Sequence, residues 1–169
     1  MLKHLLIALC LIVAGQLPAM NLSMGCNGDP IEREGILWQP IKYENSDEKR
    51  AVYAEMPGQP RTVFTNGAAV IQSQYEGAFY RLQILASDFP KDSKQIIKDM
   101  QAINGVKARL VKKFNKKKFK AVVAWENRPN GTLLFQGRVF VTSRGAYNFI
   151  VKGDFTLAQK FFESVEIVN

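Results

Sequence analysis

Apolar and polar residues alternate through most of the chain after residue 50, in runs of the length that is typical of β-strands. The runs come in pairs joined by short connections that contain Gly, Ser, Asn or Lys, which is the pattern of β-hairpins. The alternation predicts three hairpins, with strands at residues 68–75 and 79–86, 106–114 and 119–125, and 132–142 and 146–151. One face of such a sheet is apolar and needs a cover.

Two segments have the spacing of amphipathic helices and are expected to supply that cover. Asp92 or Ser93 can cap the first, which runs to about Ile103 and ends before Gly105. Asp154 is expected to cap a terminal helix with the apolar stripe Phe155, Ala158, Phe161, Phe162 and Val165. The fold class that follows is α+β: an antiparallel β-sheet of about six to seven strands with a central and a C-terminal helix packed on it.

Residues 36–43 lie ahead of this pattern and are rich in aromatic and aliphatic side chains, among them Trp38 and Tyr43. They are expected either to add an edge strand or to pack over an open end of the sheet. An aromatic lid over a ligand is the alternative, and the sequence does not choose between these interpretations.

The first 25 residues have the pattern of an export signal peptide. Lys3 and His4 form a short basic start, and residues 5–15 form an apolar stretch of about eleven residues. A membrane-spanning helix needs about 20 apolar residues, so cleavage and export are the favoured interpretation. We expect the protein in the periplasm or cell envelope of a bacterium.

Two cleavage sites fit the small residues at the end of this segment, one after Ala19 and one after Gly25. The second would make Cys26 the new first residue, which is the arrangement of bacterial lipoproteins. Ser23 stands where such proteins usually carry a large aliphatic residue. Cys26 is therefore a candidate lipidation site, and an unmodified thiol in an N-terminal tail is the alternative.

The mature chain has the length of one domain. Residues 26–35 are polar and are expected to form a flexible tether, and residues 36–169 are expected to form the single α+β domain. After cleavage the chain keeps one Cys and no His, which excludes an intrachain disulfide, a His-bearing metal site and a His-dependent catalytic triad. No metal and no cofactor are expected.

Three short motifs follow one another in a characteristic order. A strand runs into Met56-Pro57-Gly58-Gln59-Pro60, an aspartate-bearing loop ends at Pro90, and the terminal helix reads Phe161-Phe162-Glu163-Ser164-Val165. In this order, over roughly residues 50–167, they resemble the PsbP-like, or Mog-like, fold family of small exported domains. The resemblance implies an antiparallel sheet flanked by helices, in secreted proteins or lipoproteins of unassigned role, some of which act as binding or assembly factors.

The strongest local feature is a run of cations in the second hairpin. No acidic residue lies between Asp99 and Glu126, and eight Lys and Arg residues fall within residues 107–120. They are Lys107, Arg109, Lys112, Lys113, Lys116, Lys117, Lys118 and Lys120. Outside this run and the signal peptide the chain carries 14 cations against 15 carboxylates, so its excess charge is almost wholly one patch.

Such a patch suits contact with an anionic lipid or envelope surface, or with an acidic protein. Nucleic acid is not expected as a partner, because the chain is exported and Phe114 and Phe119 fit the inward face of strands better than a stacking platform. A solvated face that prevents edge-to-edge pairing of strands is the alternative.

Other motifs give only weak support to catalysis. Ser46-Asp47-Glu48-Lys49 has the Ser-x-x-Lys spacing of a lysine-assisted serine nucleophile, but no partner motif follows it. A glycosidase-like carboxylate pair could be drawn only from the scattered residues Glu44, Glu55, Glu76 and Glu126. The sequence therefore favours a non-catalytic binding or assembly domain. A hydrolase or isomerase that uses carboxylate or Lys side chains without His is the alternative.

Overall fold

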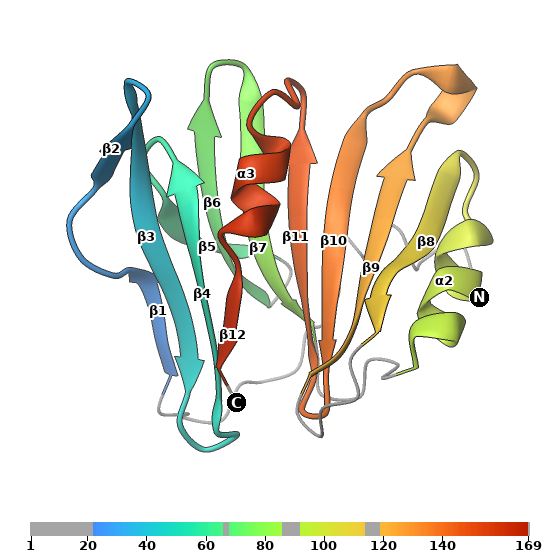
Figure 1. The fold of residues 1–169 in the computed structure, drawn as a ribbon, viewed down its shortest axis with the longest axis horizontal. Helices are drawn as coiled ribbons and strands as arrows, with labels where there is room; N and C mark the ends of the chain where they lie inside the picture. The colour runs from blue at the N-terminus through green and yellow to red at the C-terminus, as the bar shows by residue number, and fades with distance from the viewer. Residues whose placement is uncertain (1–21, 66–67, 86–91, 114–118, 169) are drawn as a thin grey trace.

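The computed structural model describes residues 22–65, 68–85, 92–113 and 119–168, which form two antiparallel β-sheets and two short α-helices (Figure 1). The five-stranded sheet contains β1 (Leu22–Cys26), β2 (Ile31–Arg33), β3 (Ile36–Asn45), β4 (Arg50–Pro57) and β12 (Glu166–Val168). The seven-stranded sheet contains, in spatial order, β5 (Arg61–Thr65), β6 (Ala68–Tyr75), β7 (Ala78–Leu85), β11 (Ala146–Lys152), β10 (Phe135–Thr142), β9 (Phe119–Asn127) and β8 (Val106–Lys113). The helices are α2 (Ser93–Gln101) and α3 (Ala158–Glu163).

The three predicted hairpins are confirmed. β6 and β7 are joined by Glu76 and Gly77, both with positive φ, a two-residue turn that matches the twist of the strands. β8 pairs antiparallel with β9, and β10 with β11. β10 begins at Phe135, later than predicted, because a 3-10 turn at Pro129–Gly131 occupies the connection before it.

The first predicted helix is confirmed as α2. Its N-cap is Asp92, whose carboxylate accepts the Lys94 N–H at 3.1 Å. Ile96 and Met100 are buried and pack with residues of β8, β9 and β10. The helical spacing of these apolar residues therefore indicated the buried side of α2 correctly.

The terminal helix is shorter than predicted. Asp154 does not cap it, because its carboxylate accepts the Thr156 N–H at 2.7 Å and α3 begins only at Ala158. Ala158, Phe161 and Phe162 are buried, as the apolar stripe indicates. After α3 the chain forms β12, which pairs with β4 and was not predicted.

The prediction of one α+β sheet with a central and a C-terminal helix packed on it is wrong. The chain is mostly β, and the seven-stranded sheet packs against a second sheet. The helices lie on opposite faces of the seven-stranded sheet. α2 packs on the outer face, which carries Val123, and α3 on the inner face, which carries Phe149 and faces the five-stranded sheet.

β3 is neither an edge strand nor a lid, because it pairs with β4 on one side and with β1 and β2 on the other. Trp38, Ile41 and Tyr43 are buried between the sheets. Pro40 lies between the part of β3 that pairs with β2 and the part that pairs with β1, so its missing N–H falls at a gap in the ladder. The buried positions change there from even to odd residue numbers, so the alternation did not choose the strand over the other interpretations of residues 36–43.

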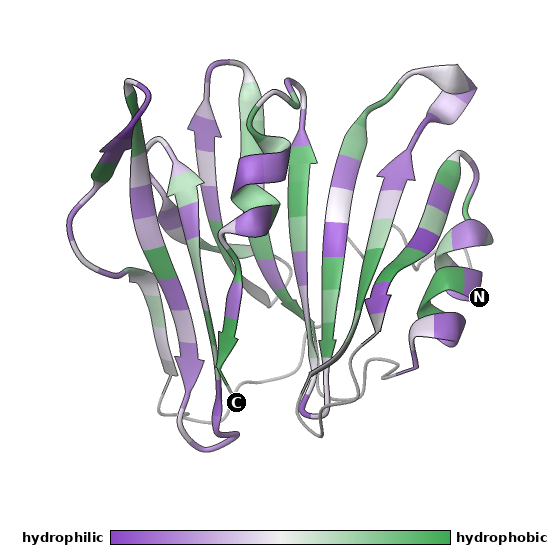
Figure 2. Cartoon of the chain, viewed as in Figure 1, coloured by the Kyte–Doolittle hydropathy of each residue, from purple (hydrophilic) through white to green (hydrophobic). Residues whose placement is uncertain are grey.

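The core between the sheets does not reach across the whole seven-stranded sheet. Phe161 of α3 makes edge contacts with Tyr80 and Phe149, with ring centroids 5.5 Å apart in each pair. Beyond α3, among the described residues of β8, β9 and β10, only Val122 and Phe140 belong to this core. The seven-stranded sheet extends past the five-stranded sheet at β8, β9 and β10 (Figure 1). Polar and apolar residues alternate along these three strands (Figure 2).

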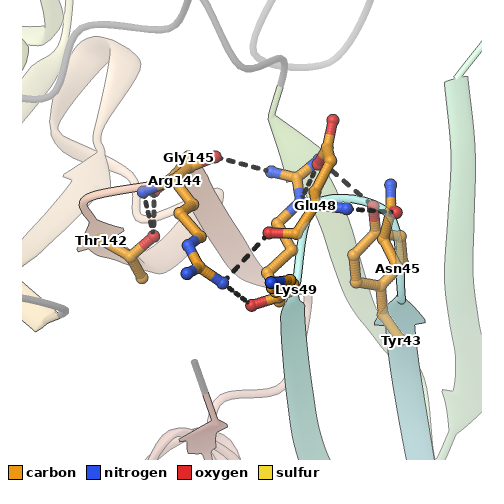
Figure 3. A network of polar contacts seen from close by, with 8 residues as sticks. Tyr43, Asn45, Glu48, Lys49, Thr142, Arg144 and Gly145 are labelled. Atoms are coloured by element: carbon orange, nitrogen blue, oxygen red, sulfur yellow. Dashed lines mark hydrogen bonds and ion pairs between the residues drawn. The ribbon is translucent and has the colours of Figure 1, made fainter.

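Arginine contacts fasten the two sheets together at one end (Figure 3). Arg50 at the start of β4 is 6% exposed, forms an ion pair with Glu48 and donates to the Tyr43 hydroxyl at 3.2 Å. It also donates to the carbonyl of Arg144, in the turn between β10 and β11, at 3.3 Å. Arg144 donates to the carbonyls of Glu48 and Lys49 in return. The connection between β3 and β4 is thereby bonded to a turn of the other sheet.

Gly145→Ala is expected to destabilise the protein by about 2–3 kcal/mol in urea unfolding, because it combines backbone strain with overpacking. Gly145 has φ 149°, and an added Cβ would collide with Nη1 of Arg50. Gly131→Ala is the matched control, since Gly131 has φ 83° with nothing within 4 Å of an added Cβ. Gly131→Ala introduces backbone strain without a collision and should cost about 1 kcal/mol. Equal losses for the two variants would show that the arginine contacts do not constrain the turn.

Candidate functional site

The inner face of β8, β9 and β10 carries a basic groove whose side chains come in rows across the three strands. Residues directly opposite one another in neighbouring strands present side chains to the same face. One row is Arg109, Ala124 and Arg138, and the next is Lys107, Glu126 and Gln136. The small Ala124, which is buried and lines the groove, separates the two arginines.

A β-bulge extends this face along β8. The pairing with β9 shifts between Leu110 and Lys112, so Val111 has no partner in the ladder. Lys112 therefore lies opposite Val122, on the same face as Lys107 and Arg109. Without the bulge, Val111 would face inward in place of Lys112, and Lys107 and Arg109 would be the only described basic side chains of β8 on the inner face.

The groove has a volume of about 370 Å³ and is closed on one side by α3. Gln159 and Phe162 of α3 line it together with the side chains of Arg109 and Arg138. The guanidinium of Arg138 lies 5.2 Å from the centre of the Phe162 ring, and its Nη2 donates to Gln159 Oε1 at 3.4 Å. Arg138 is thus held in place by an aromatic face and an amide.

Like charges meet in this groove. Burial lowers the pKa of Arg138, and the positive charge of Arg109 lowers it further. The charge of Glu163, which accepts a hydrogen bond from Gln159, offsets part of this effect and raises the pKa of Arg138, whereas Glu126 pairs with Arg128 at 3.0 Å. Within the described part of the chain, Lys107, Arg109 and Arg138 form no ion pair. An anion placed between the arginines would relieve their repulsion.

The predicted cationic run is divided by the structure. The inner face carries Lys107, Arg109 and Lys112. The backbone of Lys113 pairs with Ala121, a position of the outer face. For Lys120 the structure describes the backbone in β9. Lys116, Lys117 and Lys118 lie outside the described residues.

Arg138 was missed by the sequence analysis. Arg138 lies in β10, where Val139 and Val141 are buried on the other face of the strand. A lone arginine at an inward position of an apolar strand was the available signal. Its relation to Arg109 depends on the order of strands in the sheet, which the hairpin pattern alone does not give.

Cys26, the candidate lipidation site, is an exposed free cysteine at the end of β1. Its Cα partner in β3 is Ile41, and its Sγ lies 3.7 Å from the carbonyl oxygen of Pro60. Cleavage after Gly25 would remove the other residues of β1, Leu22 to Gly25, and leave Cys26 at an edge of the five-stranded sheet. Part of the segment 26–35 lies in β2, which pairs with β3.

The candidate catalytic residues lie in separate places. Glu44 pairs with Lys42 on β3, Glu55 pairs with Arg33, and Glu76 occupies the turn between β6 and β7. Ser46 and Lys49 lie in the connection between β3 and β4 that Arg144 holds. Among the described residues there is no group of three or more His, Cys, Asp or Glu side chains that could hold a metal ion.

Comparison with known proteins adds no assignment: no family model, no curated protein and no solved structure matches this chain. The resemblance to PsbP-like domains therefore stays a prediction. None of the helices in the described residues is both long enough and apolar enough to cross a membrane.

Arg138→Gln is expected to reduce the increase in the free energy of unfolding that NaCl produces. Raising NaCl from about 10 to 150 mM shortens the screening length from about 30 to 8 Å, which reduces the repulsion between Arg109 and Arg138. The unsubstituted protein should gain stability over this range, and Arg138→Gln should remove about 0.3 kcal/mol of that gain in urea unfolding. Lys94→Gln on α2 removes the same charge away from the groove and is the control. A gain that Arg138→Gln leaves intact would contradict the repulsion.

Proposed function

We propose that this chain is an exported, non-catalytic binding domain whose basic groove holds the anionic groups of an envelope surface. The row of Arg109, Ala124 and Arg138 is the observation that carries this proposal. Neighbouring strands lie about 4.8 Å apart, so the two arginine backbones stand about 10 Å apart across β9. A phosphate over Ala124 lies within reach of both guanidinium groups, which bind such groups through paired N–H donors.

The surroundings of the groove favour an anionic lipid surface over an acidic protein. Val111, the unpaired residue at the bulge of β8, is 46% exposed beside Lys112. Exposed aliphatic side chains next to cations suit the boundary between lipid headgroups and acyl chains. The groove is also open and lies on the face of a sheet, which allows a broad surface to approach.

Arg109→Gln with Arg138→Gln is expected to weaken binding to vesicles of phosphatidylcholine with 30% phosphatidylglycerol at least tenfold. Each cation near an anionic surface contributes about 1 kcal/mol. Co-sedimentation would be measured in a Cys26→Ser background, which removes any lipid from the protein. Ala124→Leu should also weaken binding, because it fills the space between the arginines without changing the charge.

Lys94→Gln with Lys98→Gln is the matched control for net charge. Both lysines are exposed on α2, which packs on the outer face of the seven-stranded sheet. This pair should change vesicle binding less than twofold. If both double variants lose vesicle binding equally and Ala124→Leu binds normally, then the net charge of the protein determines vesicle binding and the groove does not.

Cys26→Ser is expected to move the protein from the membrane fraction to the soluble fraction of its own cells. Cys26 is the exposed thiol that a lipid anchor requires, and thioether lipidation needs its sulfur. The intact mass of the unsubstituted protein should exceed that of the chain beginning at Cys26 by a diacylglyceryl group. An unmodified N-terminus near Met20 or at Cys26 would refute the anchor while leaving the groove untouched.

A further inference from the structure

A second cavity lies on the outer face of the seven-stranded sheet, on the side opposite the basic groove. It has a volume of about 300 Å³ and is lined by Gln72, Phe79, Arg81, Phe135, Ile150 and Lys152. The strand register explains why these residues meet. Phe79, Lys152 and Phe135 form one row across β7, β11 and β10, and Gln72, Arg81 and Ile150 form the next across β6, β7 and β11.

Gly137 and Trp125 bound the far end of the second row. Gly137 stands directly opposite Ile150, and an added Cβ there would overlap the indole ring of Trp125, which therefore lies across it. The Trp125 indole N–H donates to Asn148 Oδ1 at 3.1 Å, which fixes the ring. The indole ring therefore fills the space that a side chain at Gly137 would take.

The cavity combines two cations with apolar walls. Arg81 donates to Gln72 Oε1 at 3.0 Å, and the Lys152 ammonium lies 5.7 Å from the centre of the Phe135 ring. Neither cation forms an ion pair within the described residues. Phe79 is 46% exposed, a large apolar surface beside the charges. Guanidinium and ammonium groups held in place without a carboxylate are suited to bind an anion.

The adjoining row of the same face has unmet hydrogen-bonding capacity. Gln83 and Asn148 lie opposite each other on β7 and β11, and both are buried. Among the described residues, neither Gln83 Oε1 nor Asn148 Nδ2 has a hydrogen-bond partner. Both side chains lie one row beyond the residues that line the cavity and are buried, so they do not form part of its wall.

We propose that this cavity binds a small amphipathic organic anion, with its acidic group between Arg81 and Lys152 and its apolar body against Phe79, Phe135 and Ile150. The volume lies at the lower end of the range for small-molecule sites, about 300–1,000 Å³, which suits a single compact molecule rather than a polymer. The cavity opens on the outer face, so it is separate from the groove of the proposed function and does not depend on it.

The probe is 8-anilinonaphthalene-1-sulfonate, an aromatic sulfonate whose fluorescence rises in apolar surroundings. We expect saturable binding that Arg81→Gln with Lys152→Gln weakens at least tenfold and that Arg109→Gln with Arg138→Gln leaves within twofold. Phe79→Ala, at an exposed position that should tolerate truncation, should weaken binding by about threefold to tenfold. N-phenyl-1-naphthylamine has the same aromatic body without the sulfonate and should bind at least tenfold more weakly.

Competition separates the two parts of the proposed ligand. Decanoate, an aliphatic carboxylate, should displace the sulfonate, and inorganic phosphate at the same concentration should not. Equal binding of the charged and uncharged probes would overturn the proposal, since the cavity would then be an apolar patch. Displacement of the sulfonate by inorganic phosphate would overturn the proposal, because the cavity would then attract anions without regard to their apolar part. An equal loss of sulfonate binding in the Arg109→Gln/Arg138→Gln and Arg81→Gln/Lys152→Gln double variants would overturn it for the same reason.

Discussion

The unequal width of the two sheets governs where polar chemistry can lie in this protein. The five-stranded sheet and α3 bury the inner face of β6, β7 and β11, and there the chain places Tyr147 and Phe149, which are 0% exposed. Past α3, Val122 and Phe140 are the described residues of β8, β9 and β10 that join this core, and the rest of their inner face carries polar side chains that stay partly hydrated. The groove with Arg109 and Arg138 is a consequence of that boundary.

α3 forms the boundary itself. Two neighbouring residues of this helix, Phe161 and Phe162, lie in different surroundings. Phe161 is buried between the sheets, whereas Phe162 lines the groove and lies beneath the guanidinium of Arg138. A short helix thus joins the apolar core to the cationic face. The arginine contacts around Arg50 act at the far turns, where they hold the two sheets at one separation and so keep this boundary in place.

Local pattern predicted the local structure, because hairpins and capped helices depend on neighbours in the sequence. The hairpins of the seven-stranded sheet and the cap of α2 at Asp92 follow from such neighbours. The strand that runs into Met56-Pro57 was expected and is β4, but a separate second sheet was not predicted, because Pro40 breaks the alternation of β3 and β12 is only three residues long. The basic run of β8 was visible in the sequence, but Arg138 joins it only through the order of strands, which is a property of tertiary structure.

Side-chain NMR can test whether Arg109 and Arg138 bind one anion together. Arginine Nε–Hε resonances, assigned by substitution, would be followed while glycerol phosphate is titrated at constant ionic strength. If the two arginines share one anion, the signals of Arg109 and Arg138 shift along one binding curve, and the signal of Arg33, which is already paired with Glu55, stays within experimental error. Shifts of equal size at all arginines, or none at Arg109 and Arg138, would contradict shared binding.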